Sequence, residues 1–205
     1  ICVAFFGAAI LTYIVGFEDV DAAPAGAKAL DADLDMGSAA PAPAPAPAKA
    51  APAKAAPATL GAHMAGTVVP MNEVQDEAFA SCALGEGVAI EPSEGKLYAP
   101  ADALVDNLFD THHAVSLVTS TGAEILLHVG IDTVKLNGQY FTPHVQNGQK
   151  VKKGDLLISF DQQAIKAAGY LCTTPMIVCN TDDYAAVKVL TSGAVQPGQD
   201  LVHLE

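Results

Sequence analysis

Two histidines stand in a stretch whose apolar and polar residues alternate in the manner of a β-hairpin. The stretch THHAVSLVTSTGAEILLHVGIDTV, residues 111–134, holds three of the six histidines of the chain. We predict strands over residues 112–119 and 124–130, with His113 near the start of one and His128 near the end of the other. Imidazole is a good nucleophile near neutral pH, because its unperturbed pKa is about 6.5.

The register of the hairpin decides whether the two rings meet. With the four residues STGA in the turn, His113 lies opposite Gly130 and His128 lies opposite Val115. Side chains alternate between the two faces of a strand, so both imidazoles share one face as diagonal neighbours, with α-carbons ~7–8 Å apart. A shift of one residue would place them on opposite faces.

Convergent imidazoles at this spacing have the chemistry needed for phosphoryl transfer. One neutral ring attacks a phosphoryl group, and the second donates a hydrogen bond to its oxygens. Gly130 leaves room for an incoming group and offers a carbonyl that could orient a ring, and Thr111 adds a hydroxyl at the entrance. Spacing alone favours a simpler interpretation, in which these are ordinary histidines on a half-exposed strand. A two-histidine metal site is a further alternative, but no third ligand is evident.

Composition narrows the class of partner. The chain has 205 residues, no Arg, ten Lys and a formal net charge of −13. We therefore expect that the protein does not bind nucleic acid, because contacts with phosphate groups need clustered Lys and Arg side chains. The four cysteines form no CxxC pair and no zinc-like spacing, which favours reduced thiols. We expect no cofactor and no metal.

The chain divides into three zones. Residues 1–17, ICVAFFGAAILTYIVGF, are uncharged and indicate the end of a transmembrane helix, with a signal-peptide core or a buried helix as alternatives. Residues 18–58 are predicted to be a disordered linker, because their alternating Ala-Pro core favours extended polyproline II. His63, a few residues further on, is interpreted as a linker or cloning-derived residue.

Residues 59–205 are predicted to be a globular all-β domain. Short runs rich in Val, Ile and Leu are broken every few residues by Gly, Pro, Asn or Asp, a pattern typical of an antiparallel β-sandwich or barrel. One or two short helical turns are expected, one of them near DQQAIKAAG. Asp161 is its expected N-cap and Gly169 its stop.

The stretch LFDTHHAVSLVTSTGAEILLHVGIDTVKLNGQYF resembles the glucose-type enzyme IIA domain of the bacterial phosphoenolpyruvate-dependent sugar phosphotransferase system. The family stretches are T-x-H-A, here residues 111–114, and H-[IVF]-G-I-D-T-V, here residues 128–134. The likeness extends to GEGVAIEPSEGKLYAPADALV before the pair and to NGQKVKKGDLLISFD and TPMIVCNTDDY after it. It therefore covers nearly all of residues 59–205.

The resemblance implies a role for each residue of the pair. His128 would accept phosphate from the phosphocarrier protein HPr. His113 would stabilise the phosphoryl group without being phosphorylated, and Thr111 would order the imidazoles. The residues expected at the docking surface for HPr are the acidic Glu86 and Asp132 together with Val115, Leu126 and Gly130. Leu117, on the same predicted face, is expected in the core.

The resemblance also implies the larger assembly. ILTYIVGFED is similar to the end of the membrane-embedded C domain in permeases of the β-glucoside, sucrose and trehalose branch. The expected partners are HPr and the IIB and IIC domains of the same permease. The expected location is the cell membrane, reached through the N-terminal segment, with residues 18–205 on the cytoplasmic side.

Two alternatives come from other classes of protein. Ala-Pro linkers also join lipoyl and biotinyl carrier domains to their enzymes, but those carriers need a modifiable lysine at a hairpin tip. Lys96 in EGKLY and Lys135 in TVKLN lack that setting. A regulatory binding module without phosphorylation is the second alternative, and the histidine pair is an argument against it.

Overall fold

The structure is a computed structural model that describes residues 55–205. Residues 1–17, predicted to end a membrane helix, lie outside the described residues, as does most of the predicted linker. Within residues 55–205, no helix has the length and apolar character needed to cross a membrane.

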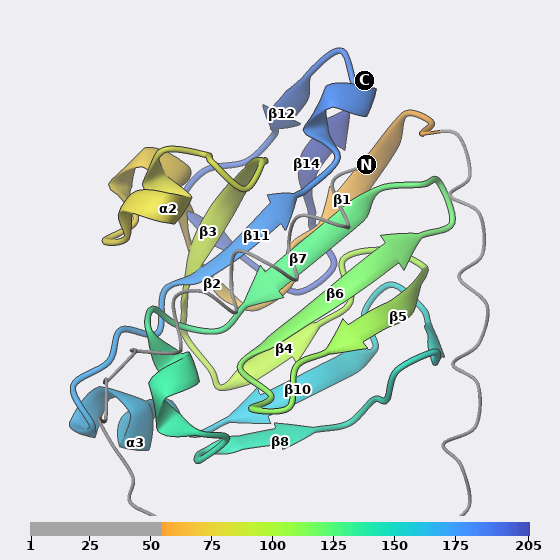
Figure 1. Cartoon of the computed structure of the whole chain (residues 1–205). Coiled ribbons are helices and arrows are strands. Elements are labelled where there is room, and N and C mark those ends of the chain that lie inside the picture. Colours follow the sequence, from red (N-terminus) through yellow and green to blue (C-terminus); the bar gives the residue numbers. More distant parts are fainter. Residues whose placement is uncertain (1–54) are drawn as a thin grey trace, which may run out of the picture. The chain divides into compact units, whose positions relative to one another are not determined.

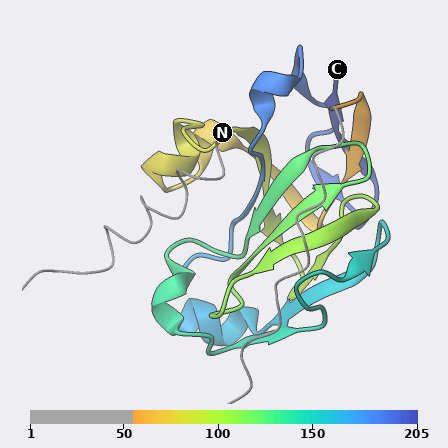
Figure 2. The ribbon, with the colours of Figure 1, turned by 45° about the vertical axis from the view of Figure 1, so that its right-hand side comes forward.

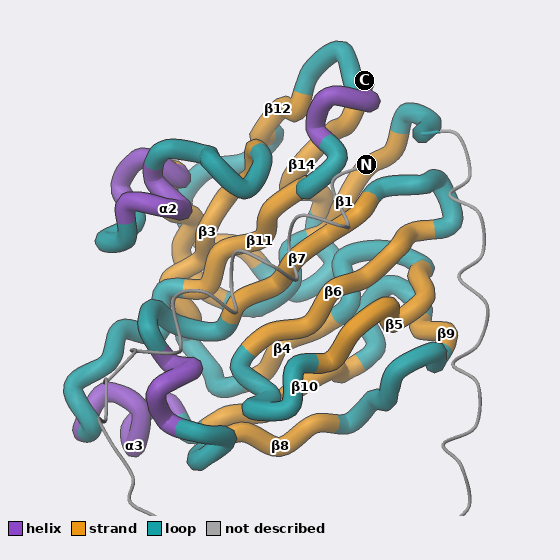
Figure 3. The backbone as a smooth tube through the Cα atoms, viewed as in Figure 1, coloured by secondary structure: helices purple, strands orange, loops and turns teal. Residues whose placement is uncertain are grey.

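The described residues form fourteen strands and five short helical segments (Figures 1 and 3). The strands are β1 (Ala58–Gly61), β2 (Gly66–Pro70), β3 (Glu86–Pro92), β4 (Lys96–Tyr98), β5 (Ala103–Leu108), β6 (Ala114–Thr119), β7 (Glu124–His128), β8 (Phe141–Pro143), β9 (Lys150–Val151), β10 (Leu156–Phe160), β11 (Thr174–Val178), β12 (Val187–Val189), β13 (Ala194–Val195) and β14 (Asp200–Leu204). The α-helices are α2 (Glu77–Ala80) and α3 (Gln162–Ala167), and the 3-10 helices are η1 (Met71–Glu73), η2 (Thr133–Leu136) and η3 (Thr181–Asp183).

The strands assemble into one large and two small antiparallel sheets. The large sheet has the order β13-β2-β3-β11-β7-β6-β5-β9, and the small sheets are β4-β10-β8 and β1-β14-β12. One face of the large sheet packs against both small sheets around the main core, which holds Leu60, Leu97, Leu117, Ile125, Ile158 and Val202 among its buried residues. The predicted all-β antiparallel sandwich is confirmed.

The opposite face of the large sheet carries a second, smaller cluster. Figure 2 shows η1 and α2, in yellow, standing to one side of the sheet. The buried members of this second cluster are Met71, Val74, Phe79, Ala89, Ala114, Leu126, Ile131 and Ile177. Helix α2 begins after Asp76, whose carboxylate accepts hydrogen bonds from the backbone N–H of Ala78 and Phe79 and so acts as its N-cap.

The predicted hairpin exists as β6 and β7, but its predicted register is wrong by one residue. Ala114, not Val115, lies opposite His128. The turn contains three residues, because the N–H of Thr119 donates to Ala123 O at 2.9 Å. Gly122 closes this turn with φ +89, as a glycine does in a three-residue hairpin loop.

The register change moves one predicted docking residue into the interior. Val115 is fully buried in the main core, on the face away from His128, so its assignment to a docking surface is wrong. Leu117 is 1% exposed in the same core, as expected. Leu126 lies on the other face, in the second cluster. In the observed register, alternation places Val115 and Leu117 on the face of the main core and Leu126 on the face of the second cluster.

The helix near DQQAIKAAG forms as predicted. The Asp161 carboxylate accepts from the N–H of Ala164 at the start of α3. Gly169 follows the end of α3 with φ +90, and its N–H donates to Lys166 O. This is the left-handed conformation that ends many helices at glycine.

The domain begins slightly before the predicted boundary, and His63 belongs to it. The N–H of Ala56 donates to Thr121 O, and Ala58 pairs with Leu204. His63 is fully buried, and its Nε2 donates to Thr174 O at 3.0 Å. The interpretation of His63 as a linker or cloning-derived residue is therefore wrong.

Candidate active site

The two imidazoles meet on the second face of the large sheet. The ring centroids of His113 and His128 are 4.8 Å apart, and the rings are inclined at 78°. His128 is the last residue of β7 and points to this face by normal alternation. His113 lies just before β6, which begins at Ala114, so the alternation of the strand does not fix its direction. The positive φ of His112, +53, turns the backbone so that the side chain of His113 lies on the same face as His128. The convergence was predicted correctly from an incorrect register.

A backbone carbonyl orients His128. Its Nδ1 lies 2.7 Å from Gly130 O. A carbonyl oxygen only accepts, so Nδ1 carries the proton and the lone pair is on Nε2. The carbonyl role expected of Gly130 is thus present. The expected open space is not, because a side chain there would meet Leu171 O at 2.5 Å and Thr133 Cγ2 at 2.6 Å.

The second histidine is held by a hydroxyl. Thr111 Oγ1 lies 2.6 Å from Nδ1 of His113, so both rings have Nδ1 occupied and Nε2 unused. His113 is 6% exposed, whereas His128 is half-buried. Phe109 packs its ring edge-on to His113 at 5.6 Å, and Phe79 of α2 packs against His128 at 5.2 Å.

The surroundings keep both imidazoles neutral at neutral pH. Burial, together with the neighbouring ring of His128, lowers the pKa of His113 to about 3. Burial also lowers the pKa of His128, opposed by the Gly130 carbonyl and by the carboxylates of Asp76 and Asp132. A neutral imidazole has a lone pair to offer, and the carboxylates stabilise positive charge that develops on the ring during attack.

Asp76 and Phe79 were among the site residues missed by the sequence analysis. Phe79 belongs to α2 and Asp76 is the N-cap of this helix, whose four residues are too few to show helical periodicity. The available signal was Asp76 itself, a preferred N-cap residue that stands directly before EAFA.

The predicted acidic rim is only partly assembled. Asp132 is exposed, forms an ion pair with Lys135 at 2.8 Å and acts electrostatically on His128. Glu86 is exposed at the start of β3, where Val178 pairs with both Glu86 and Ile125. It is thus level with the start of β7, while His128 is at its end. Glu86 and Val88 are two residues apart in β3 and so lie on the same face of the sheet, and Val88 faces the main core. Glu86 therefore does not lie beside His113 and His128.

The apolar surroundings of the pair also differ from prediction. Leu126 is 8% exposed in the floor of the second cluster, and Gly130 is buried. The large apolar side chains that reach solvent near this face are Val134 at 37% and Leu171 at 39% exposure. Leu171 is joined to the site through the β-bridge Ile131–Leu171. Among residues 55–205, no three His, Cys, Asp or Glu side chains gather closely enough to hold a metal ion.

Fold and site together define a phosphotransferase domain, in which two neutral imidazoles converge on one face of the large sheet of an antiparallel β-sandwich. The chain belongs to the family described as phosphoenolpyruvate-dependent sugar phosphotransferase system, EIIA 1, whose model matches residues 58–184. The resemblance seen in the sequence is confirmed, and the carrier-domain and regulatory-module alternatives are not favoured.

Individual relatives agree with this assignment. The chain is 51% identical over 146 residues to the PTS system beta-glucoside-specific EIIBCA component of Dickeya chrysanthemi, covering 71% of this chain and 23% of that protein. It is 51% identical over 139 residues to the component of the same name from Halalkalibacterium halodurans, covering 68% and 22%. The structure is similar to glucose permease IIA from Mycoplasma capricolum, with a TM-score of 0.67 and 31% identity over 73% of this chain and 97% of that one. The chain thus spans less than a quarter of the curated relatives.

Proposed function

We propose that His128 accepts a phosphoryl group from phospho-HPr and passes it to the IIB domain of a sugar permease. The observation that carries the proposal is the bond from Nδ1 of His128 to Gly130 O at 2.7 Å. That bond leaves the Nε2 lone pair of a neutral, half-buried ring available for attack.

The chemical step exchanges one N–P bond for another. Nε2 of His128 attacks phosphorus, the N–P bond of the HPr phosphohistidine breaks, and the HPr imidazole leaves with the electron pair. His128 keeps its Nδ1 proton and its ring becomes cationic. The bond to Gly130 O then becomes charge-assisted, and the carboxylates of Asp76 and Asp132 offset the new charge.

His113 stabilises the transferred group. A hydroxyl proton donated by Thr111 to Nδ1 of His113 leaves the ring proton on Nε2, which is the nitrogen free to donate to a phosphoryl oxygen. The ring centroids 4.8 Å apart allow one phosphoryl group to contact both rings. Its low pKa keeps His113 neutral, so it donates one hydrogen bond without trapping the phosphate as an ion pair.

The docking surface for HPr surrounds this pair. Asp76 and Asp132 favour a partner with cations near its own active histidine, in keeping with the net charge of −13. Val134 and Leu171 offer exposed apolar contacts beside them. This set replaces Val115, Gly130 and Glu86 of the sequence prediction.

The remaining steps take place within a larger permease. The relatives are EIIBCA components, so their names place B, C and A parts in one protein. In the proposed onward transfer, a cysteine thiolate of the IIB domain attacks phosphorus and His128 recovers the electron pair of the N–P bond. We propose a β-glucoside as the sugar. Residues 1–17 attach the domain to the IIC membrane part, and residues 18–205 lie on the cytoplasmic side. Tethering by residues 18–58 raises the local concentration of IIB to about millimolar.

The proposal is tested with the full chain, enzyme I, HPr and ³²P-labelled phosphoenolpyruvate, with a IIB domain added for the second transfer. We expect acid-labile label on the wild type and on the control His144→Gln, whose ring is exposed and bonded to Ser159. His128→Gln abolishes labelling. His113→Gln accepts label but transfers it to IIB at least ~10²-fold more slowly, the size of effect typical of a lost transition-state donor. Label that persists in His128→Gln rules out His128 as the acceptor.

A further inference from the structure

The carbonyl that orients His128 belongs to a peptide unit bonded at both ends. Gly130 O accepts from Nδ1 of His128, and the N–H of the same unit, on Ile131, donates to Leu171 O at 3.0 Å. A peptide whose N–H is already bonded is a stronger acceptor at its carbonyl. The orientation of His128 therefore depends on how firmly this one peptide is held.

Thr133 holds the preceding peptide unit. Its side chain is fully buried, and its hydroxyl donates to Val129 O. The N–H of Val129 donates to His113 O at 2.7 Å. Val129 therefore also links the segments that carry the two histidines. The Thr133 methyl lies where a side chain on Gly130 would be, at 2.6 Å from an added Cβ. Thr133 thus fixes both the direction of one carbonyl and the space beside the glycine.

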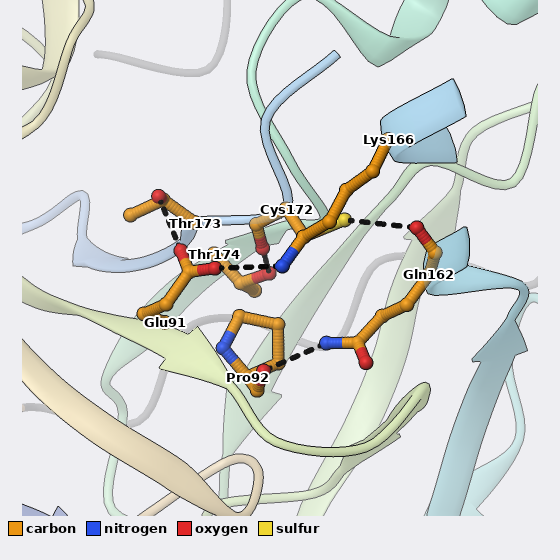
Figure 4. Close-up of polar contacts among 7 residues, drawn as sticks. All are labelled: Glu91, Pro92, Gln162, Lys166, Cys172, Thr173 and Thr174. Carbon is orange, nitrogen blue, oxygen red and sulfur yellow. Dashed lines mark hydrogen bonds and ion pairs between the residues drawn. The ribbon is translucent and has the colours of Figure 1, made fainter. Parts of the chain in front are cut away.

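The other side of Gly130 is closed by the segment that carries Leu171. Figure 4 shows how that segment is held. The Thr173 hydroxyl donates to Glu91 at 2.8 Å, and Lys166 of α3 donates to the other oxygen of Glu91 at 3.2 Å. Thr174 Oγ1 donates to Cys172 O at 2.8 Å. These hydrogen bonds restrain the segment that carries Leu171. The Leu171 carbonyl therefore stays in place when Gly130 moves.

We propose that Thr133 is a positioning residue for the phosphoacceptor, acting through the backbone of Val129 and Gly130 against the fixed Leu171 carbonyl. Gly130 has φ +75 and no side chain, so it rotates readily unless its neighbours restrain it. Rotation turns its carbonyl away from Nδ1 of His128. The ring then loses its preference for the Nδ1–H tautomer, and in the Nε2–H form the lone pair lies on Nδ1 and not on the Nε2 that attacks the phosphoryl group.

The inference rests on the proposed function, but its first test does not need phosphoryl transfer. ¹⁵N NMR of the full chain reports the tautomer and the pKa of His128. Thr133→Val removes the hydroxyl and keeps the shape, whereas Thr133→Ser keeps the hydroxyl and removes the methyl. Thr119→Val is the matched control, because Thr119 is also buried and its hydroxyl accepts from Ala123 N at the far end of the same hairpin.

We expect Thr133→Val to populate the Nε2–H tautomer of His128 and to lower its pKa further, because the Gly130 bond now raises it. Transfer from phospho-HPr falls about fivefold, the rate equivalent of one net hydrogen bond. Thr133→Ser restores the wild-type tautomer and a rate within about twofold, since the donor returns. Thr119→Val changes neither the tautomer nor the rate.

Three results overturn the inference. They are a wild-type tautomer and rate in Thr133→Val, a loss in Thr133→Ser equal to that in Thr133→Val, and an equal loss of rate in Thr119→Val. The proposed function fails separately, when the wild type carries no label on His128. In that case the NMR measurement still decides the role of Thr133.

Discussion

The buried side chain of His63 should make the folded domain less stable in mild acid. The ring is fully buried, Nε2 donates to Thr174 O, and Nδ1 has no hydrogen-bond partner among the described residues. Burial lowers the pKa of His63 to about 4, against 6.5 for the free side chain. The unfolded chain therefore takes up a proton as pH falls below about 6.5, while the folded chain does so only near pH 4.

The sign and size follow from this difference. Stability is complete above pH 6.5 and is lost as pH falls towards 4, because the unfolded state binds more protons in that window. The linkage relation gives a loss of about 2 kcal/mol at pH 5 and about 3 kcal/mol at pH 4 from His63 alone. Burial of the two active-site histidines adds a loss of the same sign.

The assay compares His63→Gln with the wild type by urea unfolding at pH 7 and pH 5. A glutamine can place its amide nitrogen near the position of Nε2 and does not titrate in this range. We expect the wild type to lose about 2 kcal/mol more than the variant between the two pH values. The exposed His144→Gln serves as control and keeps the wild-type dependence. Equal pH dependence in the wild type and His63→Gln would refute the reasoning.

Three further predictions concern the site and the register. Gly130→Ala should lower the free energy of unfolding by at least about 2 kcal/mol in urea titrations, because a side chain at φ +75 is strained and meets Leu171 O. Asp76→Asn should lower the pKa of His128 measured by NMR and weaken the salt dependence of HPr binding, since one carboxylate near the ring is removed. Val115→Ala should destabilise the domain by about 2 kcal/mol and leave HPr affinity unchanged in calorimetry, because Val115 faces the core.

Local pattern was enough to predict the sandwich, the hairpin and the helix capped by Asp161. Each depends on residues close together in sequence, such as the alternation in β6 and β7 or the Asp161–Gly169 boundaries. The register of the hairpin depended on whether three or four residues form its turn. That choice was settled by the bond from Thr119 to Ala123, which the sequence does not show, and by the positive φ of Gly122, a position that suits a three-residue loop.

The errors at single residues have long-range causes. His63 follows an Ala-Pro-rich stretch, and its burial depends on Thr174, which is 111 residues away in sequence. Asp76 reaches the histidine pair only because α2 folds over the second face of the large sheet. Glu86 was assigned to the rim through the family resemblance, but strand pairing places it level with the start of β7 and on the other face of the sheet.

In the proposed transfer from phospho-HPr to IIB, the availability of only Nε2 of His128 also determines the order of the steps. Donor and recipient must react at the same nitrogen, so HPr and IIB cannot be bound productively at the same time. The domain therefore alternates between a phosphorylated and an unphosphorylated form. Phospho-HPr reacts only with the unphosphorylated form, and IIB reacts only with the phosphorylated form. Steady-state rates measured against both partners should give parallel double-reciprocal lines, the signature of ping-pong kinetics. An excess of unphosphorylated HPr would then slow sugar uptake by competing for the place that IIB needs.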